Sequence, residues 1–180
     1  MRIRTSSSQT PPIVSAGLAP ALVESGPMGV LNDYFRARDD HEAARVTSHL
    51  GGPLRPGDDG HPAFDGVDAK GMDHTVVLGQ LIALLRGVPW TPTLCGSRLV
   101  EDACGDLEEG PWVVVIDDDV RDDLAAISPA ALPALAERWT GIEELEGTDP
   151  SEIQPVLEAL CALARRAREA GEHLYEWCSL

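Results

Sequence analysis

The sequence has 180 residues, 43% of them hydrophobic, which suits one folded domain with a buried core. Its 14 basic and 30 acidic residues give a net charge of −16, whose field repels phosphate groups and so argues against nucleic acid or an anionic membrane surface as a partner. We expect a basic protein as the partner instead.

Residues 1–27 contain few charges and show no hydrophobic periodicity. Their one apolar stretch, residues 13–23, is interrupted by Gly17 and Pro20 and follows a polar lead rather than a short basic one, unlike a secretion signal. We therefore expect residues 1–27 to be a disordered tail or an over-long start, and residues 28–180 to form a single domain.

The first folded elements follow directly after this segment. Residues 30–37 predict a strand, and Asp39 or Asp40 is placed to cap a short helix that extends to residue 50. Residues 51–62 are rich in Gly, Pro and Asp, which predicts a loop.

Residues 73–88 contain the clearest core helix. Apolar residues recur there at helical spacing, Asp73 is a suitable N-cap, and Gly87 ends the helix. Because further apolar residues flank this stripe, we expect the helix to be buried on most sides, and it is too short to span a bilayer.

The segment WVVVI, residues 112–116, is a continuous β-branched run and predicts a central strand. Val120, Leu124 and Ile127 have helical spacing, so a short helix is expected next, with residues 117–119, all aspartates, in its first turn. Negative charge there complements the helix dipole and caps free amides, which is a sufficient structural reason for the cluster.

The same aspartates also have a functional interpretation. An apolar strand followed by D-x-D resembles the haloacid-dehalogenase signature, which would make Asp117 a nucleophile and Asp119 an acid. That chemistry needs a lysine after the motif, and no lysine follows Lys70. The alternative function is thus a small metal-dependent hydrolase that uses Asp117 and Asp119, assisted by His61 or His74. Apart from this alternative, we predict no catalytic, cofactor-binding or metal-binding residue.

Other site motifs are incomplete. His41 and Glu42 begin like a zinc-protease motif, but Arg45 stands where the second histidine ligand must be. We interpret the four histidines in the first half of the chain as surface or loop residues: His41, His49, His61 and His74.

The four cysteines form no C-x-x-C pair: Cys95, Cys104, Cys161 and Cys178. Without a metal-ligand spacing or a secretion signal, they are expected to be reduced thiols in a cytoplasmic protein.

The last third predicts two helices and a strand. Ser128 and Pro129 are suited to start the first helix, and residues 149–152, DPSE, form a capping box for a long second helix. Gly171 ends that helix, and residues 173–180 alternate as a terminal strand, with Leu174, Glu176 and Cys178 on one face.

Several segments form a familiar set. They are the Met-Gly start before an aromatic strand, AFDGVDAKG before a helix that ends in LRG, ALAERWTGIEEL, and ARRAREAGEHLYEWCSL. Together they resemble the YfbM-like family of uncharacterised bacterial proteins over residues 28–180. The resemblance implies a compact α+β domain and no established activity. Leu78 and Ile82 stand where the family often has Trp and His, so no site is transferred.

The expected fold class is α+β: a compact single domain with a small sheet packed against several helices and a long C-terminal helix followed by a terminal strand. The expected function is that of a non-enzymatic, acidic binding protein of the toxin-neutralising immunity type, without a cofactor. Small size, strong acidity and the lack of a complete catalytic motif support it.

Overall fold

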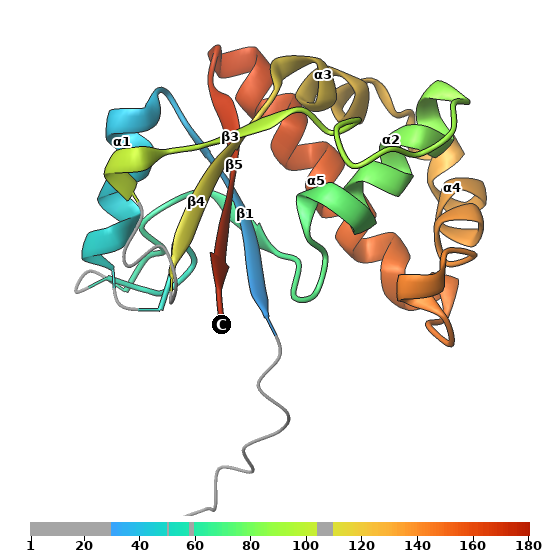
Figure 1. The fold of residues 1–180 in the computed structure, drawn as a ribbon, viewed down its shortest axis with the longest axis horizontal. Coiled ribbons are helices and arrows are strands. Elements are labelled where there is room, and N and C mark those ends of the chain that lie inside the picture. The colour runs from blue at the N-terminus through green and yellow to red at the C-terminus, as the bar shows by residue number, and fades with distance from the viewer. Residues whose placement is uncertain (1–29, 50, 58–59, 104–109) are drawn as a thin grey trace, which may run out of the picture.

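The computed structural model describes residues 30–49, 51–57, 60–103 and 110–180. Its centre is a five-stranded antiparallel sheet with helices on both faces (Figure 1). In spatial order the strands are β2 (Gly66–Asp68), β1 (Leu31–Ala37), β5 (His173–Ser179), β4 (Trp112–Ile116) and β3 (Ser97–Leu99). This architecture confirms the α+β prediction. The tail predicted at residues 1–27 lies outside the described residues.

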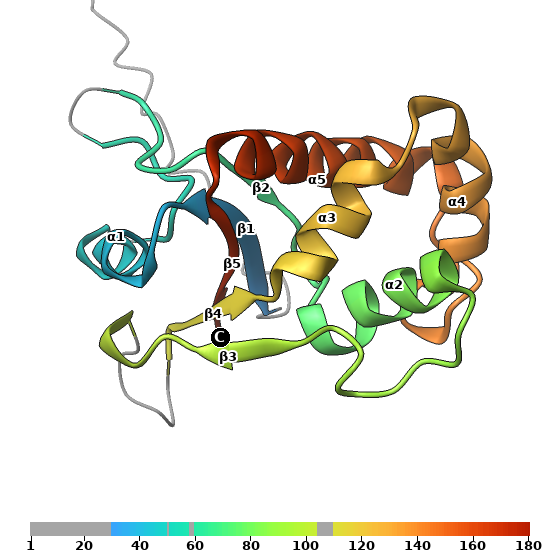
Figure 2. The same cartoon turned by 90° about the horizontal axis from the view of Figure 1, so that it is seen from above.

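The helices divide unequally between the two faces of the sheet. Figure 2 shows α1 on one side and the other four on the opposite side. The helices are α1 (Asp40–Ala44), α2 (Gly79–Arg86), α3 (Asp118–Ala126), α4 (Leu132–Trp139) and α5 (Pro150–Ala170). Within the described residues, 3-10 turns lie at Arg45–Ser48, Glu101–Ala103, Pro129–Ala131 and Glu143–Leu145. In the part of the chain that is described, no helix has both the length and the apolar composition needed to cross a membrane.

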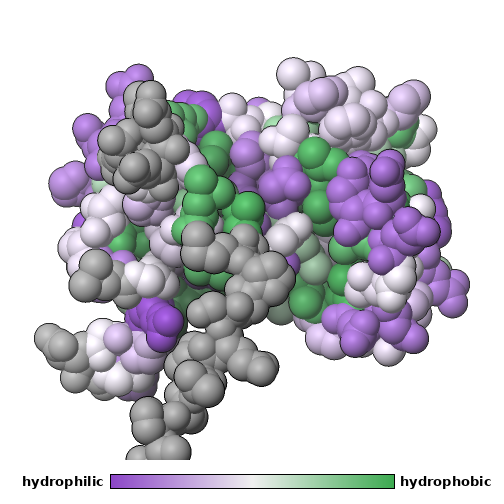
Figure 3. Space-filling view, turned by 60° about the horizontal axis from the view of Figure 1, so that its bottom comes forward, coloured by the Kyte–Doolittle hydropathy of each residue, from purple (hydrophilic) through white to green (hydrophobic). Residues whose placement is uncertain are grey.

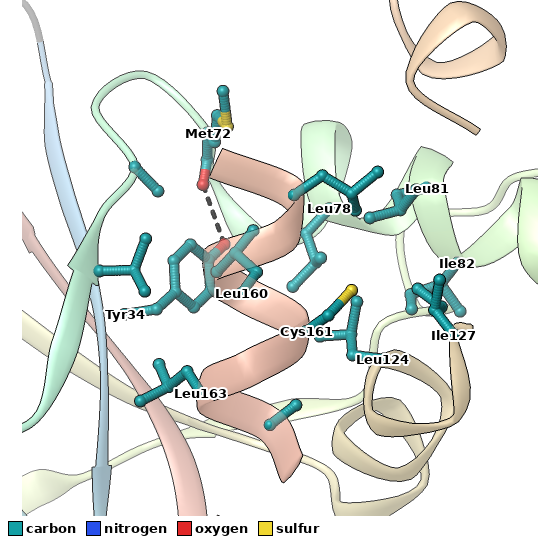
Figure 4. Packing of buried hydrophobic residues seen from close by; sticks show 14 of the residues in the cluster. Tyr34, Met72, Leu78, Leu81, Ile82, Leu124, Ile127, Leu160, Cys161 and Leu163 are labelled. Carbon is teal, nitrogen blue, oxygen red and sulfur yellow. Dashed lines mark hydrogen bonds between the residues drawn. The ribbon is translucent and has the colours of Figure 1, made fainter. Parts of the chain in front are cut away.

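Helix α5 is the main support of the larger core. Its start has the predicted capping box between Asp149 and Glu152, and Gly171 ends it with a positive φ of 69°. One face of α5 packs under the sheet and against α3 and α4. Figure 4 shows Leu160, Cys161 and Leu163 of this face among side chains from α2, α3 and the sheet.

A second, smaller core fills the opposite face of the sheet beneath α1. Phe35 and Tyr175 stack there with ring centroids 5.5 Å apart. Asp39 caps α1 as predicted, since its carboxylate accepts a hydrogen bond from the Glu42 backbone N–H at 2.8 Å. Val113, Val115 and Ile116 of β4 and residues 174–177 of β5 are buried, as the continuous apolar run of β4 predicted.

Several expectations on local structure need correction. The strands β2 and β3 were not expected, because three residues are too few to show alternation. The helix capped by Asp73 begins with a π-helical turn, His74–Leu78, before α2. The side chains of Asp117 and Ser128 make no capping hydrogen bond.

Arg165, near the end of α5, donates to the carbonyls of Ala125 and Ile127, at the end of α3. It therefore caps a neighbouring helix, a contact that depends on the packing of α5 against α3.

Asp33 and Asp68 face each other across β1 and β2. Burial, with a further contribution from the Asp68 charge, raises the pKa of Asp33 from 3.8 to about 6. A raised carboxyl pKa means that the folded state binds the proton more tightly, so this residue destabilises the fold above pH 6, and the penalty falls as the pH drops towards 4.

We therefore expect Asp33→Asn to raise the free energy of unfolding by about 1 kcal/mol at pH 7.5, a modest gain because solvent screens this partly exposed pair. No gain is expected at pH 3.5, where the Asp33 carboxyl is already protonated. Urea unfolding at the two pH values measures the difference. Glu137→Gln, at an exposed position on α4, is the control. An equal gain for Asp33→Asn at both pH values would contradict the charge-based explanation.

Candidate functional site: an acidic cleft at one end of the sheet

A cleft of about 590 Å³ opens at one end of the sheet. The strands β1 and β4 both run antiparallel to β5, which lies between them, so the residues that follow β1 and β4 meet the start of β5. This cleft, which we call the acidic cleft, is lined by Asp39, Asp40, His41, Arg98, Val115, Ile116, Asp117, Asp118 and His173.

The two aspartates that follow β1 are held by hydrogen bonds. Asp40 accepts from the Tyr175 hydroxyl at 3.0 Å and pairs with Arg98 at 2.7 Å. The hydrogen bond from Arg98, helped by that from Tyr175, lowers the pKa of Asp40. The backbone hydrogen bond from Glu42 lowers the pKa of Asp39. Both carboxylates are therefore charged at neutral pH.

The two aspartates that follow β4 differ in their surroundings. Asp118 contacts Arg121 at 2.9 Å and Nδ1 of His173 at 2.7 Å. The Asp117 carboxylate lies against Gly96, where an added Cβ would be only 2.0 Å from its Oδ2. Asp117 is exposed and makes no side-chain hydrogen bond or ion pair with another described residue. It is therefore the carboxylate of the cleft that is most available to a partner.

The structure separates Asp119 from Asp117. Asp119 pairs with Arg86 at 2.9 Å, an arginine that also holds Asp123 at 2.6 Å, and it does not line the acidic cleft. His61 is exposed in the loop before β2 and does not line it either. Among the described residues, no group of three or more His, Cys, Asp or Glu side chains could hold a metal ion. The hydrolase alternative thus has no convergent set of ligands in this part of the chain.

His74 is the clearest error in the expectations from sequence. Its imidazole is only 19% exposed, and its Nδ1 is hydrogen-bonded to Oε2 of Glu176 on β5, whose side chain is 2% exposed. The other oxygen of Glu176 accepts from Nδ2 of Asn32 at 2.7 Å. The buried Oδ1 of Asn32 has no partner among the described residues.

The His74–Glu176 pair borders a second hollow, of about 380 Å³, which we call the histidine pocket. Its lining residues are Asp73, His74, Thr75, Ser97, Arg98, Leu99, Trp112, Val114, Glu176 and Cys178. The side chains of Glu176 and Cys178 share one face of β5, as the alternation predicted.

The chemistry of the histidine pocket favours binding over nucleophilic catalysis. Nε2 of His74 lies 3.2 Å from the Thr75 hydroxyl, but the Asp73 carboxylate already occupies the Thr75 and Val76 amides that would otherwise stabilise an oxyanion. Burial, and to a smaller extent the Glu176 charge, raises the pKa of Cys178 to about 11. The Cys178 thiol is therefore protonated and weakly nucleophilic at neutral pH.

One signal for this pair was present in the sequence. Glu176 lies between Leu174 and Cys178 on the inward face of a terminal strand. A carboxylate on an apolar face must find hydrogen-bond donors, so it pointed to a buried partner without identifying His74 or Asn32.

Comparison of the chain with known protein families, with curated proteins and with solved structures found no match. The YfbM-like resemblance therefore stays a prediction.

Proposed function

We propose that the protein is an acidic binding protein that recognises a basic protein partner through the acidic cleft. The observation that carries this proposal is that four aspartates and a single arginine line one surface cleft. A basic side chain that enters the cleft meets Asp117 without displacing an internal partner of that carboxylate. Neutralisation of a basic toxin, the immunity-type activity expected from the sequence, is the specific form of this function that we propose.

The distribution of ion pairs supports the proposal. Many of the arginines form ion pairs with carboxylates of the same chain: Arg36, Arg86, Arg121 and Arg166. These cations are therefore engaged in holding the domain together. Exposed carboxylates such as Glu101 and Asp102 remain beside the cleft region. The charged residues of residues 1–27 are Arg2, Arg4 and Glu24, so residues 28–180 contain 12 basic and 29 acidic residues and have a net charge of −17. A charge of this sign would steer a basic partner towards the protein.

A blocked arginine tests the cleft directly. N-acetyl-arginine amide, titrated into the isotope-labelled protein, is expected to shift the amide resonances of residues around Asp117 and His173, with an affinity that falls as salt rises from 0.05 to 0.5 M. The neutral isostere N-acetyl-citrulline amide is expected to leave them nearly unchanged. Asp117→Asn should weaken arginine binding about threefold, the size of one exposed ion pair.

The matched control is Glu137→Gln, which removes an exposed carboxylate on α4 outside the cleft and should leave the affinity unchanged. Equal binding of arginine and citrulline, or an Asp117→Asn variant that binds arginine as well as the parent, would overturn the proposal.

A further inference from the structure

Strand β3 is an open edge of the sheet. In Figure 2 it lies at the outer side, beyond β4, with no described element alongside it. The Asp117 N–H donates to the Gly96 carbonyl and the Val100 N–H donates to the Val113 carbonyl, each at 2.9 Å. Hydrogen-bonded positions alternate along an antiparallel strand, so Gly96, Arg98 and Val100 direct their backbone groups towards β4.

It follows that Ser97 and Leu99 direct their N–H and C=O groups outwards. No other described residue pairs with these backbone groups. All three residues of β3 are exposed, and the Leu99 side chain is 39% exposed. Such an edge is a template for a further strand, and this one is not covered by any described helix.

Hollows lie on both faces of this edge. Arg98, which pairs with Asp40, contributes to the acidic cleft on one face, whereas Ser97 and Leu99 line the histidine pocket on the other, where Arg98 also forms part of the lining. A third hollow, of about 530 Å³, continues along β3 past Leu99 to Glu101 and Asp102. Successive side chains of an added strand would therefore enter hollows on alternate faces.

We propose that the β3 edge binds an extended, basic segment of the partner as a sixth, antiparallel strand. This inference rests on the proposed function and specifies how the basic partner is held. Antiparallel addition continues the pairing of the whole sheet and supplies the outward groups of Ser97 and Leu99 with partners.

The side chains on the Arg98 face define the charges of the segment. A residue opposite Gly96 lies beside the Asp117 carboxylate, and a residue opposite Val100 lies beside Glu101 and Asp102, so both are expected to be basic. The residue opposite Arg98 meets a guanidinium and is expected to be neutral.

The opposite face of the edge selects apolar side chains. Residues opposite Ser97 and Leu99 point towards the histidine pocket, where Leu99 and Val114 provide apolar surface. Figure 3 shows hydrophobic surface (green) next to hydrophilic surface (purple) on the side of the molecule that faces the viewer. The expected motif is therefore basic, apolar, small neutral, apolar, basic.

A blocked peptide of sequence TKVTVKT has this motif and serves as the probe. We expect it to bind the full-length protein and to shift the Ser97 and Leu99 amide resonances most strongly. N-methylation of both valines removes the donors that face β3 and should weaken binding more than tenfold, whereas N-methylation of the central threonine, whose amide points away, should change it less than threefold.

The charge-reversed peptide TEVTVET separates this inference from the proposed function. If the valine-methylated peptide binds as well as the parent while TEVTVET does not bind, recognition of basic groups stands and strand addition is overturned. If TEVTVET binds as well as TKVTVKT, the proposed function fails as well. If TKVTVKT does not bind at millimolar concentration, strand addition is overturned. The arginine titration then tests by itself whether the acidic cleft binds a basic side chain.

A protein variant gives an independent readout. Leu99→Pro removes one of the two outward N–H groups of β3 without removing a hydrogen bond to β4, whereas Leu99→Ala removes only the side chain. We expect Leu99→Pro to bind TKVTVKT about fivefold more weakly than Leu99→Ala. Equal affinities of the two variants, with unchanged amide spectra elsewhere, would contradict strand addition.

Discussion

Replacing Glu176 with leucine is expected to lower the free energy of unfolding by about 3–5 kcal/mol. The Glu176 carboxylate is the hydrogen-bond partner of both His74 and Asn32 inside the fold. Its loss leaves the buried Asn32 amide and the partly buried His74 imidazole without this hydrogen-bond partner, which costs more than the added apolar side chain contributes. Urea unfolding monitored by circular dichroism measures the loss. Glu169→Leu, at an exposed position of α5, should change the same quantity by less than about 0.5 kcal/mol.

A double-mutant cycle identifies the interaction with His74. His74→Leu alone should also destabilise strongly, because it removes one of the two hydrogen-bond partners of the buried carboxylate. The double variant His74→Leu/Glu176→Leu is expected to lose clearly less than the sum of the single losses, since it removes both members of the pair. Additive losses would show that the two side chains stabilise the fold independently.

Trp139→Ala is expected to lower the free energy of unfolding by about 3–5 kcal/mol, because it removes a large side chain from the core. Trp139 is 0% exposed, and its indole N–H donates to the Val77 carbonyl at 2.9 Å. This side chain joins α4 to the π-helical turn that begins with His74. A residue of α4, more than sixty positions further along the chain, therefore helps to position this turn.

Two variants distinguish the contributions of Trp139. Trp139→Phe keeps most of the apolar area but leaves the Val77 carbonyl without this donor, so about 1–3 kcal/mol is expected. Trp90→Ala is the matched control: Trp90 also donates to a carbonyl, that of Thr75, but is 37% exposed, and its loss should stay below about 1.5 kcal/mol. A Trp139→Ala loss no larger than the Trp90→Ala loss would contradict the role of Trp139 in the core.

Local sequence was sufficient for several elements whose pattern extended over many residues or whose cap lay within four residues, but not for the caps expected at Asp117 and Ser128, which make no capping hydrogen bond. The capping box of α5, the caps at Asp39 and Asp73, the apolar run of β4 and the alternation of β5 were all predicted and are confirmed. In each of these cases the determining contact is between near neighbours in the chain, or the side-chain period shows which face is buried.

The acidic cleft and the His74–Glu176 pair depended on contacts that no local pattern contains. His74 and Glu176 are 102 residues apart, and the aspartates after β1 and β4 come together only because β5 lies between these strands. The edge strand β3 is three residues long, so its existence follows from pairing with β4 rather than from periodicity. The sequence thus specified the helices, the strands β1, β4 and β5 and the acidity of the chain. The order of strands in the sheet determined which charges share a cleft and which carboxylate is buried, because strand pairing joins residues without regard to their separation in the chain.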